Sequence, residues 1–301
     1  MAGGQERELR RRIKSVQATR KITKAMELIA ASQIARAQAR IAANRAYNQG
    51  MARVVREAAK GDSVAARNML GTPEEIRNVA IVAIVGDRGL AGAYNSSVMR
   101  ATDRLIAEHK AKGINTRLFT VGRKAIAYFK FRGVEVEANY QGFADKPEFA
   151  DARELAAQVA QAFSSGEVDQ VLIVSSRFLS ASSQAVELRQ LLPLALPEDE
   201  VGEEEAEHEV RGYVEFEPDP AELLAELAPR ALESEIFTAL LEGSASFHTA
   251  QQRAMAAATE NADELATTLT RIMNRARQDS ITTEIMEIVG GAEALRQSKG
   301  A

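Results

Sequence analysis

The stretch ELATTLTRIMNRARQDSITTEIMEIVGGAEAL, from Glu264 to Leu295, decides the fold that we expect for this chain. Apolar residues recur in it at alternating steps of four and three residues, in two series that Arg277 to Ser280 sets out of register. The series are Leu265, Leu269, Ile272 and Ala276, followed by Ile281, Ile285, Ile288, Ala292 and Leu295. This spacing is typical of a coiled-coil seam and therefore predicts a long helix that packs against another helix.

The placement of proline extends this prediction to both ends of the chain. All seven prolines lie between Pro73 and Pro229. Because proline removes an amide donor and clashes with the preceding turn, ends without it permit long helices. We expect helices over Arg7 to Lys60, roughly 75 Å long, and over Ala221 to Gln297, with Pro229 kinking or interrupting the second helix near its start.

Neither terminal helix can bury its apolar stripe alone, so the two ends are expected to wind around each other as an antiparallel coiled coil. The C-terminal helix is the longer one, and its last residues should extend past the partner helix. There Ile281, Ile285, Met286, Ile288 and Val289 would form an exposed apolar patch. The sequence therefore predicts another protein that encloses this end.

The middle of the chain, about Glu74 to Pro218, alternates strand and helix signals. The expected strands are Val79 to Val85, Thr116 to Val121, Val134 to Asn139, Gln170 to Ser175, Val186 to Leu192 and Tyr213 to Phe216. Helices such as Ser97 to Lys112 and Ala150 to Ser164 lie between them. This order favours a Rossmann-like α/β domain with a parallel or mixed sheet. We expect an N-terminal coiled-coil helix over residues 1–72, the α/β domain over 73–220 and a C-terminal coiled-coil helix over 221–301.

Composition excludes several classes of function. The chain has no cysteine and only three histidines, which excludes thiol chemistry and disfavours a histidine-ligated metal. The net charge of −4 gives no overall reason to expect nucleic acid, although residues 1–60 carry 14 Lys and Arg against 4 Asp and Glu. The sequence shows neither a secretory signal nor an apolar run of the roughly 20 residues that span a bilayer. We expect a protein that lies in the cytoplasm, or that reaches a membrane only by docking to something embedded there.

A glycine-rich loop in VAIVGDRGLAGAYN, Val82 to Asn95, looks at first like a phosphate cradle. Its spacing is G-x-x-G-x-x-G, however, whereas a dinucleotide site requires G-x-G-x-x-G, and Asp87 would set negative charge beside the phosphates. We interpret the loop as a strand-to-helix turn in which Gly89 and Gly92 permit unusual backbone angles or close packing. Asp87 and Asn95 are expected to bond local amides. The acidic run Glu198 to Glu209 is expected to be a solvated loop, and no catalytic constellation or cofactor site is found.

Four stretches of the chain together resemble the gamma subunit of rotary, bacterial-type ATP synthases. They are SVQATRKITKAMELIAAS (Ser15 to Ser32), GDRGLAGAYN (Gly86 to Asn95), EPDP (Glu217 to Pro220) and ITTEIMEIVGGAEA (Ile281 to Ala294). The resemblance implies a non-catalytic rotor shaft of a proton-translocating ATP synthase at the cytoplasmic face of the bacterial membrane. Three alpha and three beta subunits would enclose the shaft. The α/β domain would form a foot that contacts the epsilon subunit and the membrane rotor ring.

The resemblance also implies which residues of the shaft meet the partner subunits. Arg20, Lys21 and Lys24 lie near Met26, a position where the family's shaft meets acidic segments of beta. Arg277 and Gln278 match positions that hydrogen-bond a loop of beta, and Glu284 and Glu287 match carboxylates of the C-terminal signature. The apolar contacts would come from Ile281, Ile285 and Ile288.

One segment departs from the family pattern, and two other functions compete with the rotor. Ser246 to Gln252 reads SFHTAQQ, where relatives usually carry a form like S-E-x-A-A-R, so the shaft contact of that arginine does not transfer and Arg253 is a candidate replacement. The first competing function is a nucleic-acid-binding coiled coil that uses the basic N-terminal arm. The second is a nucleotide-dependent enzyme built on the middle domain. Neither has a supporting motif.

Overall fold

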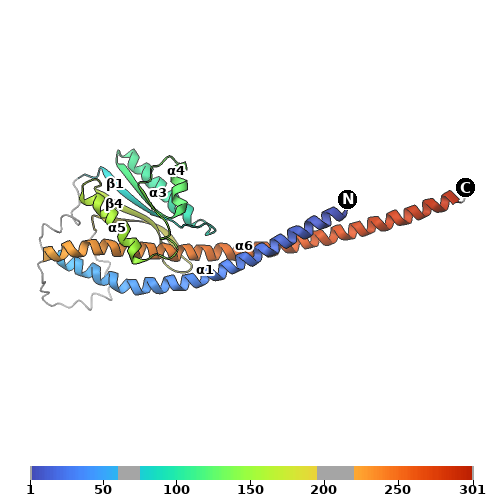
Figure 1. Ribbon diagram of the computed structural model, residues 1–301, viewed down its shortest axis with the longest axis horizontal. Coiled ribbons are helices and arrows are strands. Elements are labelled where there is room, and N and C mark those ends of the chain that lie inside the picture. Colours follow the sequence, from blue (N-terminus) through green and yellow to red (C-terminus); the bar gives the residue numbers. More distant parts are fainter. Residues whose placement is uncertain (1, 60–74, 195–219, 300–301) are drawn as a thin grey trace. The chain divides into compact units, whose positions relative to one another are not determined.

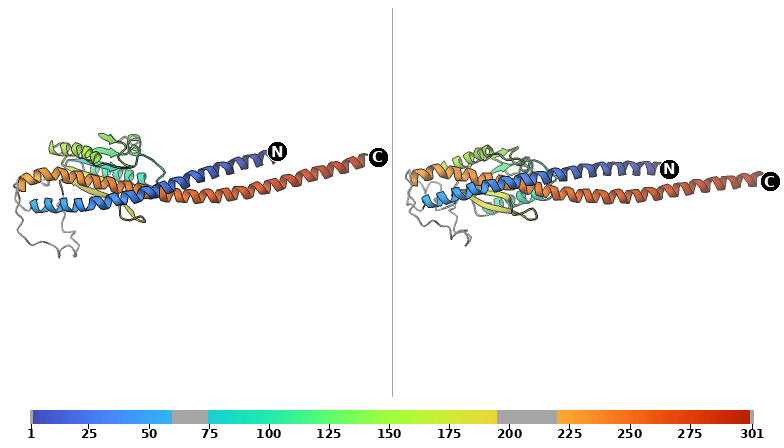
Figure 2. Two further views of the ribbon diagram at one scale, coloured as in Figure 1. Left: turned by 60° about the horizontal axis from the view of Figure 1, so that its bottom comes forward. Right: turned by 90° about the horizontal axis from the view of Figure 1, so that it is seen from below.

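The computed structural model describes residues 2–59, 75–194 and 220–299 (Figure 1). Two long helices, α1 (Ala2–Ala59) and α6 (Pro220–Lys299), accompany a sheet and three shorter helices. The chain divides into two compact units. Unit 1 comprises Met1–Ile29 and Gln252–Ala301, and unit 2 comprises Ala30–Gln251. In each unit, α1 and α6 lie side by side and run in opposite directions (Figure 2). The predicted antiparallel coiled coil and α/β domain are confirmed.

Unit 2 contains a mixed, Rossmann-like sheet of five strands in the order β3-β2-β1-β4-β5. The strands are β1 (Asn78–Ile84), β2 (Asn115–Val121), β3 (Ala138–Tyr140), β4 (Gln170–Phe178) and β5 (Gln184–Leu192). The first four are parallel, and β5 pairs antiparallel with β4. A hairpin at Leu179 to Ser183 makes that reversal, so no crossover helix is needed.

Five of the six expected strands are present, and one of these is shorter than expected. Strand β3 begins at Ala138 instead of Val134, because the Val134 amide donates to the Phe129 carbonyl at the end of α4 (Arg123–Phe131). Val134 and Val136 instead pack against the core beside α4. The predicted strand Tyr213 to Phe216 and the acidic run Glu198 to Glu209 lie outside the described residues.

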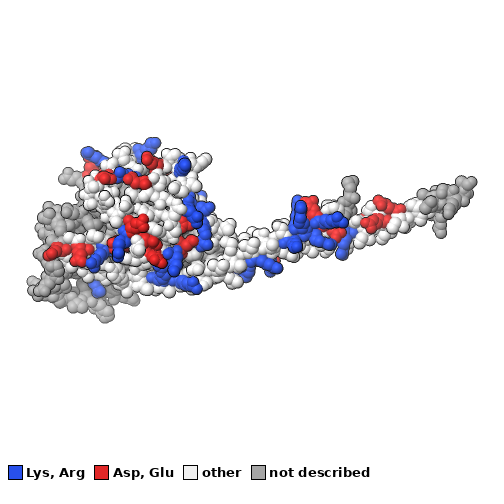
Figure 3. Space-filling model, in the orientation of Figure 1, with Lys and Arg blue, Asp and Glu red and all other residues white. Residues whose placement is uncertain are grey.

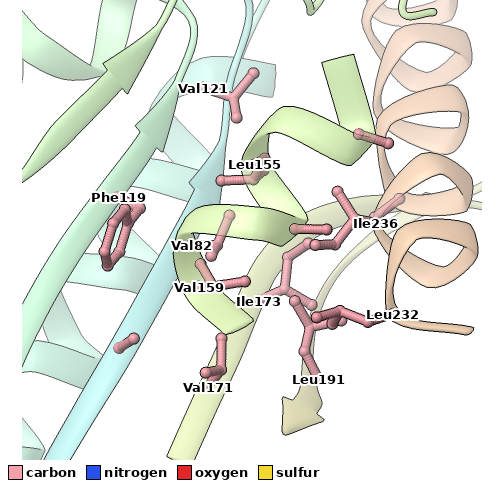
Figure 4. Packing of buried hydrophobic residues seen from close by; sticks show 14 of the residues in the cluster. Val82, Phe119, Val121, Leu155, Val159, Val171, Ile173, Leu191, Leu232 and Ile236 are labelled. Atoms are coloured by element: carbon pink, nitrogen blue, oxygen red, sulfur yellow. The ribbon is translucent and has the colours of Figure 1, made fainter. Parts of the chain in front are cut away.

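Helices cover both faces of the sheet, as alternation of buried side chains along the strands requires. Helices α3 (Tyr94–Ala111) and α4 (Arg123–Phe131) pack on the face that carries Ile81 and Ala83. Helix α5 (Phe149–Ser164) and the unit 2 part of α6 pack on the face that carries Val82. Figure 4 shows Leu155 and Val159 of α5 and Leu232 and Ile236 of α6 converging on this second face. The α6 helix is therefore part of the core of the α/β domain.

Helix α6 continues through Pro229, so the expected interruption does not occur. Proline in a helix interior loses one hydrogen bond and clashes with the preceding turn, at about 3 kcal/mol. Pro229 itself is exposed, whereas Ala228 and Leu232 on either side of it are buried. Burial of these neighbours on the apolar face offsets the local cost and holds the helix together.

Two glycines let the carboxyl ends of β1 and β2 approach their neighbours closely. A side chain at Gly122, where φ is +99°, would collide with the Val85 carbonyl oxygen. A side chain at Gly86 would meet the Phe247 ring of α6 at 2.9 Å. Only glycine fits both places, so the turn after β1 lies directly against α6.

We expect Gly122→Ala to destabilise the chain by about 3 kcal/mol, because it combines a left-handed backbone with a backbone collision. Gly113→Ala is the matched control. Its φ is +75°, but no heavy atom lies within 4 Å of the added carbon, so the cost should be about 1 kcal/mol. Urea unfolding of the full-length protein measures both. Equal losses for the two variants would contradict the proposed collision.

Candidate partner interface

In unit 1, α1 and α6 meet along a narrow seam of mostly small residues. Most buried or half-buried positions of α6 from residue 255 onward recur at steps of three and four residues. These seam positions are Met255, Thr259, Ala262, Ala266, Leu269, Met273, Ala276 and Ser280. Thr23 of α1 is buried and its hydroxyl lies 2.8 Å from that of Thr259. Arg20 Nε and Asp263 Oδ1, 2.5 Å apart, form an ion pair between the same helices.

Of the four residues in the first predicted apolar series of α6, two lie in this seam and two do not. Leu269 and Ala276 lie in the seam, but Leu265 and Ile272 are 48% and 44% exposed. On α1, Ile22 and Ile29 are likewise exposed, at 61% and 59%. The small residues at the true seam positions let the helix backbones approach, and the larger apolar residues beside them are left outside. The two helices therefore bury only part of their apolar surface on each other.

The C-terminal part of α6 extends past the end of α1, as the sequence predicts. In an antiparallel pair the numbers of two facing residues have a constant sum, and Thr23 facing Thr259 sets that sum at 282. This register sets Ala2, the first residue that the structure describes, opposite Ser280. Every residue from Ile281 to Ala292 is exposed, with Met286 and Ile288 at 69% and 71%. We call Ile281 to Ala292 the tip.

The residues that the resemblance assigns to partner contacts lie on exposed parts of unit 1, but they are not gathered in one place. Arg277, Gln278, Glu284 and Glu287 are exposed on α6 just before or within the tip, alongside Ile281, Ile285 and Ile288. Lys21 is exposed on α1 and has no ion-pair partner among the described residues. Lys24 pairs with Glu27 of its own helix, and Met26 is half-buried. Arg20 already pairs with Asp263, which the sequence did not indicate.

Basic side chains gather near the N-terminal end of α1 in unit 1 (Figure 3). Arg7, Arg10, Arg11, Arg12 and Lys14 are all exposed there. Glu6 and Glu8 neutralise Arg10 and Arg12 through ion pairs one turn away along α1. The excess of Lys and Arg in residues 1–60 is evident from the sequence, but none of these five residues was predicted as a site, although the run ERELRRRIK was an available signal.

Two polar side chains hold the glycine-rich loop after β1 in unit 2 as a turn. Asn95 bonds local groups, as expected, whereas Asp87 bonds amides of remote segments and not the local amides that were expected. Asn95 accepts the Gly86 amide at 2.7 Å and donates to the Arg88 carbonyl at 3.0 Å. The buried Asp87 carboxylate accepts the amides of Arg123 and Gly142, each at 3.0 Å. Gly92 has a positive φ, as expected, and so does Leu90. The loop thereby ties together the ends of β1, β2 and β3.

The segment that departs from the family pattern packs against this loop. The buried Phe247 contacts Tyr94 edge to face, with ring centroids 5.5 Å apart. His248 Nε2 lies 3.3 Å from the Asp145 carbonyl, and Arg88 forms an ion pair with the Asp145 carboxylate. Burial lowers the pKa of His248, and nearby Arg88 lowers it further, against the opposing effect of Asp145. Arg253 is exposed and has an interaction within the chain.

In the part of the chain that the structure describes, neither a metal site nor a membrane-spanning helix is present. There, no three His, Asp or Glu side chains are grouped so that they could hold a metal ion. Likewise, none of the described helices combines the length and apolar character that crossing a bilayer requires. The exposed surface of unit 1 is therefore the feature best suited to binding a partner protein.

Fold and surface together define a protein that combines a two-helix coiled coil with a Rossmann-like α/β domain. Solved structures share this fold at low sequence identity. A chain in the Euglena gracilis mitochondrial ATP synthase structure with OSCP, F1 and the c-ring is 18% identical, with a TM-score of 0.69 over 99% of this chain and 97% of that one. A chain in the rotor structure of the same enzyme is 20% identical, with a TM-score of 0.64 over 93% and 99%.

Sequence comparisons give the family. The ATP synthase family model matches residues 5–295. The ATP synthase gamma chain of Parafrankia sp. is 45% identical over 97% of this chain and 98% of its own length. That of Clavibacter sepedonicus is 43% identical over 99% and 100%. The chain belongs to the ATP synthase gamma chain family, and nothing in these comparisons supports the nucleic-acid alternative.

The buried His248 should make stability sensitive to mild acid. Because its folded-state pKa lies below the ordinary value of about 6.5, the unfolded chain takes up the proton more readily. The stability that neutral His248 contributes is therefore full above its ordinary pKa and decreases as the pH falls below it. We expect His248→Gln, which keeps an N–H donor for the Asp145 carbonyl, to lose less stability than the natural chain between about pH 7.5 and 5.5. Urea unfolding at several pH values tests this, and parallel curves would contradict it.

Proposed function

We propose that this chain is the central rotor shaft of a proton-translocating bacterial ATP synthase. It couples rotation of a membrane rotor ring to conformational change and ATP synthesis or hydrolysis in beta subunits. Family membership supports this proposal. The observation that carries it is the tip, a run of exposed apolar residues on α6 that α1 does not cover. A surface of this kind requires an enclosing protein.

Three alpha and three beta subunits would supply the enclosure. The coiled coil is asymmetric around its axis because its two helices differ in sequence, with Ile22 and Ile29 exposed on α1 and Leu265 and Ile272 exposed on α6. Each beta subunit therefore meets a different face of the shaft, and each is biased toward a different conformation. A rotation exchanges these biases, which is a population shift driven by differential contact.

The residues on and near the tip divide the contacts by chemistry. Ile281, Ile285 and Ile288 would form an apolar bearing, since apolar contacts have no directional requirement. Arg277 and Gln278 would hydrogen-bond a loop of beta, and Glu284 and Glu287 would accept bonds from the same socket. Lys21 and Lys24, near Met26, would attract acidic segments of beta at long range. The ion pair with Asp263 reduces the share of Arg20 in that attraction.

The α/β domain would be the foot of the rotor. We assign residues 73–220 to the foot, to whose core Leu232 and Ile236 of α6 also contribute, and residues 1–72 and 221–301 to the two helices of the shaft. The foot would contact the epsilon subunit and the membrane rotor ring at the cytoplasmic face of the membrane. The chain itself would be non-catalytic, because its glycine-rich loop uses Asp87 and Asn95 for internal bonds. Nucleotides would be bound and hydrolysed by the neighbouring subunits.

We expect the purified chain to show no ATPase activity and to be poorly soluble, because the tip is exposed. Co-expression with the alpha and beta subunits of the same organism should give a soluble complex with ATPase activity. Size-exclusion chromatography followed by a coupled ATPase assay measures both properties. Substantial hydrolysis by the chain alone would contradict the non-catalytic assignment.

Charges introduced on the apolar tip should disturb the complex without unfolding the chain. We expect Ile285→Asp with Ile288→Asp to reduce assembly or coupled activity at least about tenfold, since burying each carboxylate in an apolar socket is costly. Thr282→Asp with Thr283→Asp adds the same charge at two exposed polar positions of the tip and serves as the control. Thermal unfolding of the chain should not change in either variant. Equal activity of the two complexes would mean that the isoleucines are not enclosed.

A further inference from the structure

A cluster of polar side chains lies between α1 and α6 in unit 2, where a coiled-coil seam ordinarily holds apolar residues. The cluster consists of Asn44, Asn48, Ser234 and Thr238, of which Ser234 is buried and the others are half-buried. Asn44 Nδ2 donates to Thr238 Oγ1 at 3.0 Å, and Asn48 Nδ2 donates to the same oxygen. Ser234 Oγ donates to Asn48 Oδ1.

The bonds of this cluster are mutually consistent. A hydroxyl group has one donor and two acceptor lone pairs. Thr238 uses all three, because it accepts both asparagine amides and donates to the Ser234 carbonyl at 2.8 Å. Asn48 donates to one residue of α6 and accepts from another. Both side-chain amides of α1 thus find partners one turn apart on α6.

The directly facing pairs of the cluster fit one register of the two helices, and the bond from Asn48 to Thr238 reaches one turn further along α6. The residue numbers of the pairs Asn44–Thr238 and Asn48–Ser234 add up to 282, and so do those of Thr23 and Thr259 in unit 1. The apolar positions of the seam distinguish registers poorly, because many are alanines. The buried alanines of the two helices include Ala30, Ala37 and Ala58 of α1 and Ala228 and Ala245 of α6. One alanine replaces another with little change in contact when helices slip.

A slip of one heptad, about seven residues, would leave the asparagines without partners. A slip in one direction sets Asn48 opposite Leu241 and Asn44 opposite Ala245. A slip in the other direction sets Asn48 opposite Leu227 and Asn44 opposite Ala231. Neither leucine nor alanine has a side-chain donor or acceptor. Half-buried amides without partners disfavour both slipped registers. The same slip would also lengthen or shorten the part of α6 that extends past α1 by about 10 Å.

We propose that Asn44, Asn48, Ser234 and Thr238 are positioning residues that select the register of α1 against α6. Thr23 and Thr259 reinforce the same register in unit 1. The consequence rests on the proposed rotor function. These six residues would fix how far the tip reaches into its enclosing subunits and which face of the tip each subunit meets. An alanine seam alone would supply close packing without that specificity.

The full-length chain allows a direct test, because its sequence has no cysteine to interfere with spin labelling. Labels at the exposed positions Arg36→Cys and Ala225→Cys report the axial offset of the two helices by pulsed electron paramagnetic resonance. The natural seam should give one distance. Replacing the cluster with Asn44→Leu, Asn48→Leu, Ser234→Ala and Thr238→Val should add a population displaced by about 10 Å. As a control, Gln38→Leu with Gln49→Leu changes two exposed polar positions of α1 and should add no displaced population.

A second variant moves the cluster instead of deleting it. Leu227→Ser and Ala231→Thr, combined with Ser234→Leu and Thr238→Ala, set the same hydroxyls one heptad earlier on α6. The main distance should then shift by about 10 Å. This variant decides the question if the first one loses its helical circular dichroism. One unchanged distance in either folded variant would overturn the proposal. The measurement needs no ATPase activity, so it succeeds or fails independently of the rotor assignment.

Discussion

The narrow seam between α1 and α6 is the constraint on which the rest of the structure depends. Small residues such as Ala262 and Thr23 occupy it, so the helix backbones lie close and few large side chains fit between them. Apolar residues that do not fit, including Ile22 and Leu265, remain on the outside of the pair. The seam thus creates both a stiff two-helix rod and an apolar outer surface that the rod cannot cover by itself.

The α/β domain has the strand order of nucleotide-binding folds, yet its residues serve attachment. The crevice at the carboxyl ends of the parallel strands is where such folds place ligands. Here the Asp87 carboxylate joins the loops after β1, β2 and β3, and Gly86 admits the Phe247 ring of α6. The groups that would cradle a phosphate instead fasten the sheet to a long helix. Fold alone would have suggested the wrong chemistry.

The sequence predicted elements whose signals are local, and it was less accurate where a neighbour decides the outcome. Four strands and both long helices follow from periodicity and proline placement. Strand β3 is shorter because the end of α4 takes the Val134 amide, which no local pattern records. Helix α6 passes Pro229 because tertiary packing offsets the lost bond. Likewise, the pairing of Arg20 with Asp263 depends on a register that only the folded helix pair defines.

Directional bonds and apolar contacts have opposite roles in the two parts of α6. Within unit 2, the side chains of Ser234 and Thr238 bond across to α1, and a small displacement would break those bonds. On the tip, by contrast, the side-chain hydrogen bond of Thr283 returns to its own helix, at the Asp279 carbonyl. The large residues around it are apolar, and their contact energy depends on buried area and only weakly on orientation. A shaft that turns inside a socket needs this distribution: interactions sensitive to position between its own strands, and interactions tolerant of rotation at its outer surface.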